Sequence, residues 1–366
     1  MKQRKQAIAN VFAVIVVTMA FIACPTIGSG AVTWIQGNYS QSDGQVSSVS
    51  FKDNNTPNSL LLCSVSCEVD LTTTLVPSGD VVISDSAVNS WAKVASAYDN
   101  YKIADGYYTW QYNSLFYADN TKGTSNQSIK VGIANYYQAP EGSEGPWYCT
   151  VMLEEFAPPS NEWLVPDGTV YGFQNGTYTS TGTVTLTGSP ITPTANGDLI
   201  YSILWDDASV SGYDNFSAGS GYTLLLEDED SGVGNLADEY LVQGTVGNIA
   251  PTFNFSSTYE PEQWTILTAA FTTTCRGPLI MVEPSGYQAI SILEGINDAT
   301  VSGSVIEVNN YAAFLESPVF SNTVPISLEG GYDCSLDSIV GYSEIDGQVV
   351  INGTAAVTIG NIIIGP

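Results

Sequence analysis

Acidic and amide side chains gather on one Gly-containing stretch, Leu224 to Tyr240, which reads LLLEDEDSGVGNLADEY. Such hard oxygen ligands suit Ca²⁺, which binds about six to eight of them. The spacing is not that of an EF-hand loop, so two interpretations stay open: a calcium site and a solvated acidic turn. The candidate calcium ligands are Glu227, Asp228, Asp230, Asn235 and Asp238.

Aromatic side chains recur in DGYYTWQYNSLFY, residues 105–117. On a strand, a period of two places Tyr108, Trp110, Tyr112 and Phe116 on one face. Flat aromatic rings can bind sugars, whose C–H groups form an apolar face that covers the ring. The candidate stacking residues are Tyr108, Trp110, Tyr112 and, from the following loop, Trp147. The alternative interpretation is that these rings belong to an ordinary sandwich core.

The sequence contains no histidine. Ser-His-Asp and Cys-His nucleophilic systems are therefore excluded, because both need an imidazole base. Carboxylate chemistry remains, either as a pair of acids that cleaves glycosides or as calcium-assisted lyase chemistry with a Lys or Arg base. No Lys or Arg lies between Gly277 and Pro366, so the C-terminal part could not supply that base. We expect no enzyme, with a carboxylate-dependent glycoside hydrolase or polysaccharide lyase as the enzymatic alternative.

The chain has six cysteines, and five remain beyond Cys24. An odd number leaves one thiol unpaired in any all-disulfide arrangement. Cys275 lies where one expected domain gives way to the next, and Cys334 follows a GGYD turn in the second domain. A bridge between these two, our candidate disulfide, would tie the second domain to its entry segment. Cys63 and Cys67 are four residues apart on a strand-like segment without histidine, which argues against a zinc site.

The elements that must position these residues are almost all strands. From about Val32 to Thr274 the chain contains short runs rich in Val, Ile, Thr, Tyr and Trp, bounded by Gly, Pro, Asn and Asp. SLLLCSVSCEV is typical of a buried strand, and YYTWQYNSLFYA alternates. Strands at this spacing predict a single antiparallel β-sandwich domain over residues 32–274.

The order of several motifs in this domain resembles a recurrent jelly-roll-like sandwich module of bacterial secreted and cell-surface proteins. The motifs are NSLLLCSVSCEV, VVISDSAVNSWAKV, SLFYADNTKGTSNQSIKVGI and WYCTVMLEEFA, followed by TPTANGDLIYSILW, SGYTLLLED and EQWTILTAAF. The resemblance covers roughly Ser48 to Phe271 and implies fold and location rather than a ligand. In one departure, Val88 stands where the SDSxGNxW turn of the module has glycine.

Residues 275–366 resemble the first rungs of right-handed parallel β-helix proteins of the pectate-lyase-like type. AISILEGINDATVSGSVIEV predicts a short helix, with Ile292, Leu293 and Ile296 on one face, that would cap the N-terminal end of the coil. VPISLEGGYDCSLDSIVGYSEIDGQVVINGTAAVTIGNIIIG then supplies short strands separated by Gly, Asp and Asn. The expected fold is therefore all-β: a sandwich domain followed by a short solenoid with one capping helix.

The first residues resemble an export signal. Lys2, Arg4 and Lys5 precede an apolar run and then small residues, which is the order of a secretory signal over residues 1–31. Two cleavage interpretations stay open. In one, FIAC is a lipobox and Cys24 becomes lipidated; in the other, cleavage after SGA makes Val32 the first residue.

The net charge of the chain restricts the classes of molecule that can bind to it. Nine Lys and Arg stand against thirty-seven Asp and Glu, a formal net charge of −28. Such a field repels nucleic acid and anionic lipid, so contact with a membrane is expected only through a lipid on Cys24. We expect a non-catalytic extracellular or outer-surface protein that binds polysaccharide or a partner protein, with Ca²⁺ as the one cofactor considered. The alternative is a structural or filament subunit that assembles through the open end of the solenoid.

Overall fold

A computed structural model gives the fold of the chain. It describes residues 31–43, 48–71, 81–104, 107–119, 121–123, 130–134, 148–178, 182–206, 214–228, 235–257, 262–276, 280–310 and 313–365. Nearly all regular structure is β, with one short helix, and no described helix is long and apolar enough to span a bilayer. The expected all-β fold with antiparallel sheets is confirmed.

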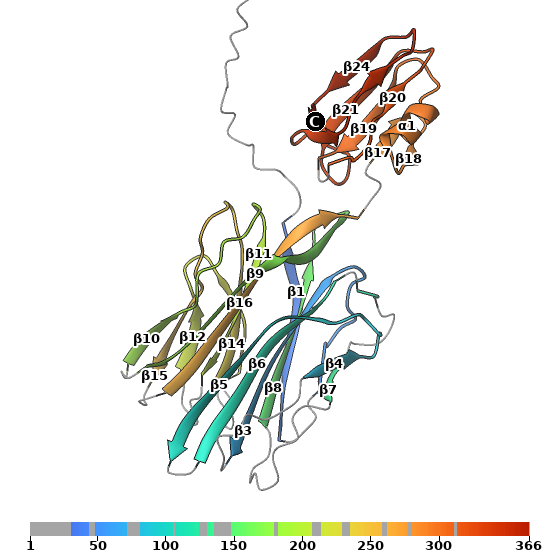
Figure 1. The fold of residues 1–366 in the computed structure, drawn as a ribbon. Coiled ribbons are helices and arrows are strands. Elements are labelled where there is room, and N and C mark those ends of the chain that lie inside the picture. The colour runs from blue at the N-terminus through green and yellow to red at the C-terminus, as the bar shows by residue number, and fades with distance from the viewer. Residues whose placement is uncertain are drawn as a thin grey trace, which may run out of the picture.

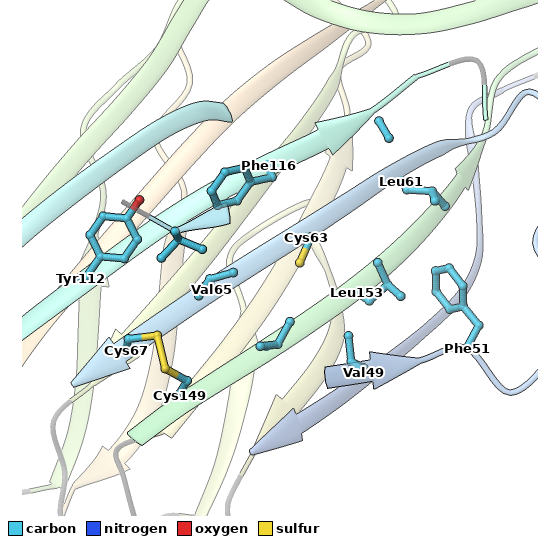
Figure 2. Packing of buried hydrophobic residues seen from close by; sticks show 13 residues of the cluster. Val49, Phe51, Leu61, Cys63, Val65, Cys67, Tyr112, Phe116, Cys149 and Leu153 are labelled. Carbon is cyan, nitrogen blue, oxygen red and sulfur yellow. A yellow bond between two sulfur atoms is a disulfide. The ribbon is translucent and has the colours of Figure 1, made fainter. Parts of the chain in front are cut away.

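The first half of the chain forms a sandwich of two antiparallel sheets. The five-stranded first large sheet has the order β1 (Thr33–Asp43), β8 (Tyr148–Ala157), β3 (Leu60–Leu71), β6 (Tyr107–Ala118), β5 (Ala92–Ala104). The three-stranded first small sheet has the order β2 (Ser48–Ser50), β7 (Lys130–Ala134), β4 (Val82–Asp85). A core that includes Cys63, Val65, Tyr112 and Leu153 fills the space between them (Figure 2).

The second half repeats this topology. The second large sheet has the order β9 (Glu162–Tyr178), β16 (Glu262–Cys275), β11 (Leu199–Asp206), β14 (Asn235–Val242), β13 (Thr223–Asp228). The second small sheet has the order β10 (Gly182–Thr187), β15 (Thr252–Ser257), β12 (Asp214–Ala218). Adding eight to each strand number of the first half gives the strand at the same place in the second half. Residues 32–274, which we expected to form one sandwich, therefore form two.

The two large sheets pack face to face, which gives four layers (Figure 1). Side chains of the first large sheet alternate between the first small sheet and the second large sheet. On β3, Leu61 and Cys63 face the former, while Leu60 and Leu62 face the latter. Because both of its faces are covered, β3 is buried from Leu60 to Cys67, as the apolar run in its sequence predicted.

The C-terminal part contains both antiparallel and parallel pairs. It comprises β17 (Ile280–Glu283), β18 (Tyr287–Ala289), α1 (Ile292–Asp298), β19 (Ser304–Asn309), β20 (Val319–Phe320), β21 (Ile326–Tyr332), β22 (Ser343–Asp346), β23 (Val350–Ile351), β24 (Val357–Gly360) and β25 (Ile362–Gly365). β17 pairs antiparallel with β18 and β19. Parallel pairs join β19 to β21, β21 to β24, β20 to β23 and β22 to β25.

The helix α1 forms where the sequence predicts one. Ser291 caps it by accepting a hydrogen bond from the Glu294 backbone N–H at 3.1 Å, and the Glu294 carboxylate accepts from the Ile290 N–H at 3.0 Å. The first bond is that of a capping box, whereas the second reaches the N–H of Ile290, one residue before the cap, rather than that of Ser291. The expected apolar face was partly wrong. Ile292 and Ile296 are buried, but Leu293 is exposed, because Gly295 rather than Leu293 lies against Ile280 and Ile306.

The turn after β4 holds the residue that departs from the sandwich module. Val88 has a φ of 57°, in the left-handed region that favours glycine, and its side chain is exposed. Asp85 stabilises the turn by accepting hydrogen bonds from the Asn89 N–H at 3.1 Å and the Trp91 indole at 2.7 Å. A β-branched residue is therefore forced into a conformation that it rarely adopts.

Val88→Gly should raise the free energy of unfolding by about 1 kcal/mol. The left-handed conformation costs a residue with a Cβ about 1–2 kcal/mol, and the greater freedom of glycine in the unfolded chain offsets part of the gain. Urea titration measures the change. Val88→Ala keeps the Cβ and is the control, so an equal gain from alanine would contradict this explanation.

Candidate functional site

The residues expected to stack on sugars do not form a described exposed row. Tyr112 is 2% exposed and belongs to the core between the first large and first small sheets, so its role as a binding residue was wrong (Figure 2). Tyr108 and Trp110 lie on β6, where only their backbone is described, and Trp147 lies outside the described residues. The alternative interpretation, a sandwich core, holds for Tyr112 and for Phe116.

The acidic residues expected to bind calcium are divided by the fold. Glu227 and Asp228 end β13 and Asn235 begins β14, with side chains outside the description, and Asp230 lies outside it entirely. Asp238 is fully buried between the large sheets, so its inclusion in an exposed loop site was wrong. Among the described residues, no group of three or more His, Cys, Asp or Glu side chains could hold a metal ion.

Four of the cysteines form two disulfides. Cys275 and Cys334, the candidate pair, are bonded at 2.09 Å, and Asn161 and Ser335 hydrogen-bond beside them at 3.3 Å. Sequence reasoning missed the second bridge, Cys67–Cys149, which joins directly opposed residues of β3 and β8 (Figure 2). The remaining thiol, Cys63, is buried, and burial raises its pKa. Cys24 lies outside the described residues.

A pair of buried carboxyl groups lies between the two large sheets. Glu154 projects from β8 and Asp238 from β14, and neither side chain has any exposed surface. The two carboxyls lie close enough for each to shift the pKa of the other, so we refer to them as the carboxyl pair; Glu154 Oε1 has no other partner among the described residues. The residues two positions before and after each carboxyl lie on the same face of its strand and are apolar or aromatic. They are Met152 and Phe156 on β8, and Leu236 and Tyr240 on β14.

Four donors and one glycine position the carboxyl pair. The Trp34 indole N–H donates to Glu154 Oε2 at 2.5 Å. The Tyr201 hydroxyl donates to Asp238 Oδ2 at 2.7 Å, and the Leu226 backbone N–H donates to Asp238 Oδ1 at 2.8 Å. Because the Tyr201 proton points to Asp238, the Ser64 hydroxyl, 3.0 Å away, donates to the Tyr201 oxygen. Gly37, directly opposite Glu154 on β1, leaves room for the Glu154 carboxyl.

Burial changes the proton affinity of both carboxyls. Desolvation, followed by the charge of Asp238, raises the pKa of Glu154 well above its usual range. Desolvation also raises the pKa of Asp238 to about 6, although the hydrogen bonds from Tyr201, Leu226 and Glu154 lower it. The Glu154–Asp238 bond therefore has Glu154 as the protonated donor and Asp238 as the acceptor.

This geometry suits a shared proton rather than glycoside cleavage. The acids of glycosidases stand about 5–9 Å apart, with the sugar between them. Glu154 and Asp238 are in hydrogen-bond contact and sealed from solvent by two sheets. Sequence reasoning missed the pair because LEEFA and LADEY look like strand ends rich in acids. The alternation along each strand could not single out the pair, because Glu155 and Glu239, on the opposite faces of the same strands, are equally buried.

Comparisons with known proteins do not assign the chain to a family. No family model matches the chain, and no curated protein matches it. Among solved structures, the major capsid protein of mavirus matches at 8% identity with a TM-score of 0.21, over 75% of this chain and 95% of that one. A likeness this distant carries no argument about this chain.

Gly37→Ala should lower the free energy of unfolding by about 1–3 kcal/mol, the usual cost of overpacking. A Cβ at Gly37 would collide with both carboxyl oxygens of Glu154, and the Trp34 indole holds that carboxyl in place. Urea titration of the purified protein measures the loss. Gly244→Ala is the control, because a Cβ there meets nothing within 4 Å. Equal effects of the two substitutions would contradict the tight fit around Glu154.

Proposed function

We propose that the chain is a non-catalytic, exported structural protein that assembles with a second copy of itself at a cell or extracellular surface. The observation that carries the proposal is a set of stacked apolar columns in the C-terminal part that are covered at one end and uncovered at the other. Phe314 and Ile345 are 7% and 0% exposed, whereas Ile364, next in that column, is 48% exposed. Phe320 is fully buried, and Ile351 beside it is 52% exposed.

Such columns are typical of a short parallel β-helix, which we infer for this part. At one edge of its main sheet, α1 and the β17–β18 hairpin cover the apolar interior. At the other edge lies β24, for which the described residues show a partner on one side only. An edge strand with unpaired backbone groups beside exposed isoleucines can accept another strand.

The charges favour a second copy as the occupant of this end. Each chain carries a net charge of −28, so two copies repel wherever their acidic surfaces meet. The stretch from Gly347 to Gly365, which includes β23, β24 and β25, contains no ionisable side chain. Two such ends can therefore meet without bringing carboxylates together. A contact between identical ends is isologous and closes as a dimer.

The disulfides support the export part of the proposal. Cys67–Cys149 and Cys275–Cys334 would persist in an oxidising compartment, which agrees with a secretory signal in residues 1–31. Of the candidate sugar-stacking residues, the one whose side chain is described, Tyr112, lies in the core and does not support polysaccharide binding. The carboxyl pair has no exposed surface, so no substrate can reach it. This supports the proposal that the protein is non-catalytic.

Ile351→Glu combined with Ile364→Glu should abolish self-association. Wild-type protein should sediment as a dimer whose fraction rises with concentration, whereas the variant should remain monomeric, because four added carboxylates would meet in the contact. Ile290→Glu is the control: Ile290 is 90% exposed but precedes α1, at the covered end. A monomeric wild type at every concentration, or equal loss with Ile290→Glu, would overturn the proposed assembly.

A further inference from the structure

We propose that Glu154 and Asp238 form a proton-operated latch between the two sandwiches. The latch is closed while the pair keeps at least one proton, and it releases when both carboxyls are ionised. The proposal concerns the contact between the large sheets and is independent of assembly at the C-terminal end.

The position of the pair makes it a latch rather than a part of the general core. Glu154 and Asp238 lie on β8 and β14, each the second strand from an edge of its sheet. The outer strands β1 and β13 are also tied to the pair, through the Trp34 indole and the Leu226 N–H. Loss of the Glu154–Asp238 contact therefore removes the polar tie on one side of the sheet contact, where the cluster of Met152, Trp205 and Leu236 and the Phe156–Tyr240 ring pair remain. The other side is held by apolar residues such as Leu115, Leu164 and Leu267.

Among the described residues, no group that faces the pair supplies a positive charge. From β1 comes the Trp34 indole, from β3 the Ser64 hydroxyl, from β11 the Tyr201 hydroxyl and from β13 a backbone N–H. Of these only Tyr201 titrates, and desolvation raises its pKa further. The remaining charged contributor is Glu239, on the opposite face of β14, where it accepts from the Gly219 N–H at 2.9 Å. The side chains of Glu68, Glu227 and Asp228 lie outside the described part.

The hydrogen-bond partners of the pair determine how well each of its protonation states is stabilised. With both protons bound the pair is neutral. When Asp238 ionises, the single negative charge is held by three donors: the Tyr201 hydroxyl, the Leu226 N–H and the Glu154 carboxyl. When Glu154 also loses its proton to solvent, the bond between the sheets is lost and two carboxylates are left in contact in a site of low dielectric.

Folding raises the pKa of both carboxyls, so the closed state is stabilised at low pH and destabilised as the pH rises. In the unfolded chain both ionise near pH 4, while the folded pair keeps its protons to higher pH. Stability is therefore greatest in acid, falls from about pH 4 upward, and levels off only above the folded pKa values. Asp238 alone, with a pKa raised from 3.8 to about 6, accounts for roughly a hundredfold change in the opening equilibrium.

Hydrogen exchange of the backbone amides of β8 and β14 tests the latch in the full chain. The opening constant, corrected for intrinsic exchange chemistry, should rise about a hundredfold or more between pH 4.5 and pH 8 in the wild type. In the Glu154→Gln/Asp238→Asn double variant the pair cannot ionise, so the rise should disappear. Each single substitution leaves one titrating group and should reduce the rise at least about tenfold. Glu155→Gln is the matched control: Glu155 is equally buried on β8 but points to Gln36 and Thr56, so the rise should remain.

Three outcomes would overturn the latch. The first is a wild type whose β8 and β14 amides open equally at both pH values, and the second is a double variant that keeps the rise. The third is closure of the wild type at pH 8 by Ca²⁺ or Mg²⁺, with no such effect on the double variant, which would make the pair a cation site instead. If the double variant fails to fold, the two single variants and the control still decide between these outcomes.

Discussion

The contact between the two large sheets is the constraint on which the rest of the structure depends. Each large sheet is covered on one face by its own small sheet and on the other by the large sheet of the second sandwich. Side chains in both phases of a strand must therefore fit an interior, as along β3 from Leu60 to Cys67. Polar groups on these strands cannot turn to solvent and have to find partners between the layers. The carboxyl pair, with its donors from β1, β11 and β13, is the result of that requirement.

The contact also has an internal symmetry. β1 lies against β13 and β5 against β9, while the middle strands β3 and β11 meet through Ser64 and Tyr201. β1 of the first sandwich corresponds to β9 of the second, and β5 corresponds to β13. The β1–β13 and β5–β9 contacts are therefore equivalent, as the two halves of an isologous dimer contact are. The side chains break the symmetry. On one side β8 and β14 bring Glu154 to Asp238; on the other, β6 and β16 carry Asn113 and Thr265, whose buried Nδ2 and Oγ1 atoms have no partner among the described residues. The ionisable pair therefore acts on one side of the contact only.

The sequence was informative about local structure and poor at deciding which surfaces meet. The strand runs, the helix near Ile292 and the special turn at Val88 all follow from local pattern, and the structure contains each of them. The period of two in β6 separates Tyr112 from Leu115 correctly, but it cannot say which face is exposed. In the two inner sheets of a four-layer stack both faces are covered, so the described part of an aromatic row that resembles a binding surface is core. Glu154 and Asp238 are likewise joined only by the packing of two sheets, for which no local pattern exists.

Composition explains why a proton, rather than a cation, joins the two sandwiches. A buried carboxylate needs a counter-charge or a proton, because the cost of desolvating the charge is otherwise too great. This chain has thirty-seven acids for nine Lys and Arg and no histidine, so cations are scarce as partners. Burial accordingly raises the pKa not only of the pair but also of Asp198 and of Glu239, the latter to about 7. These groups all add stability in acid, where the repulsion within a strongly negative chain is also weakest. The same shortage of cations that keeps the outer surface negative thus makes the interior depend on protons, and it ties the closure of the two sandwiches to pH.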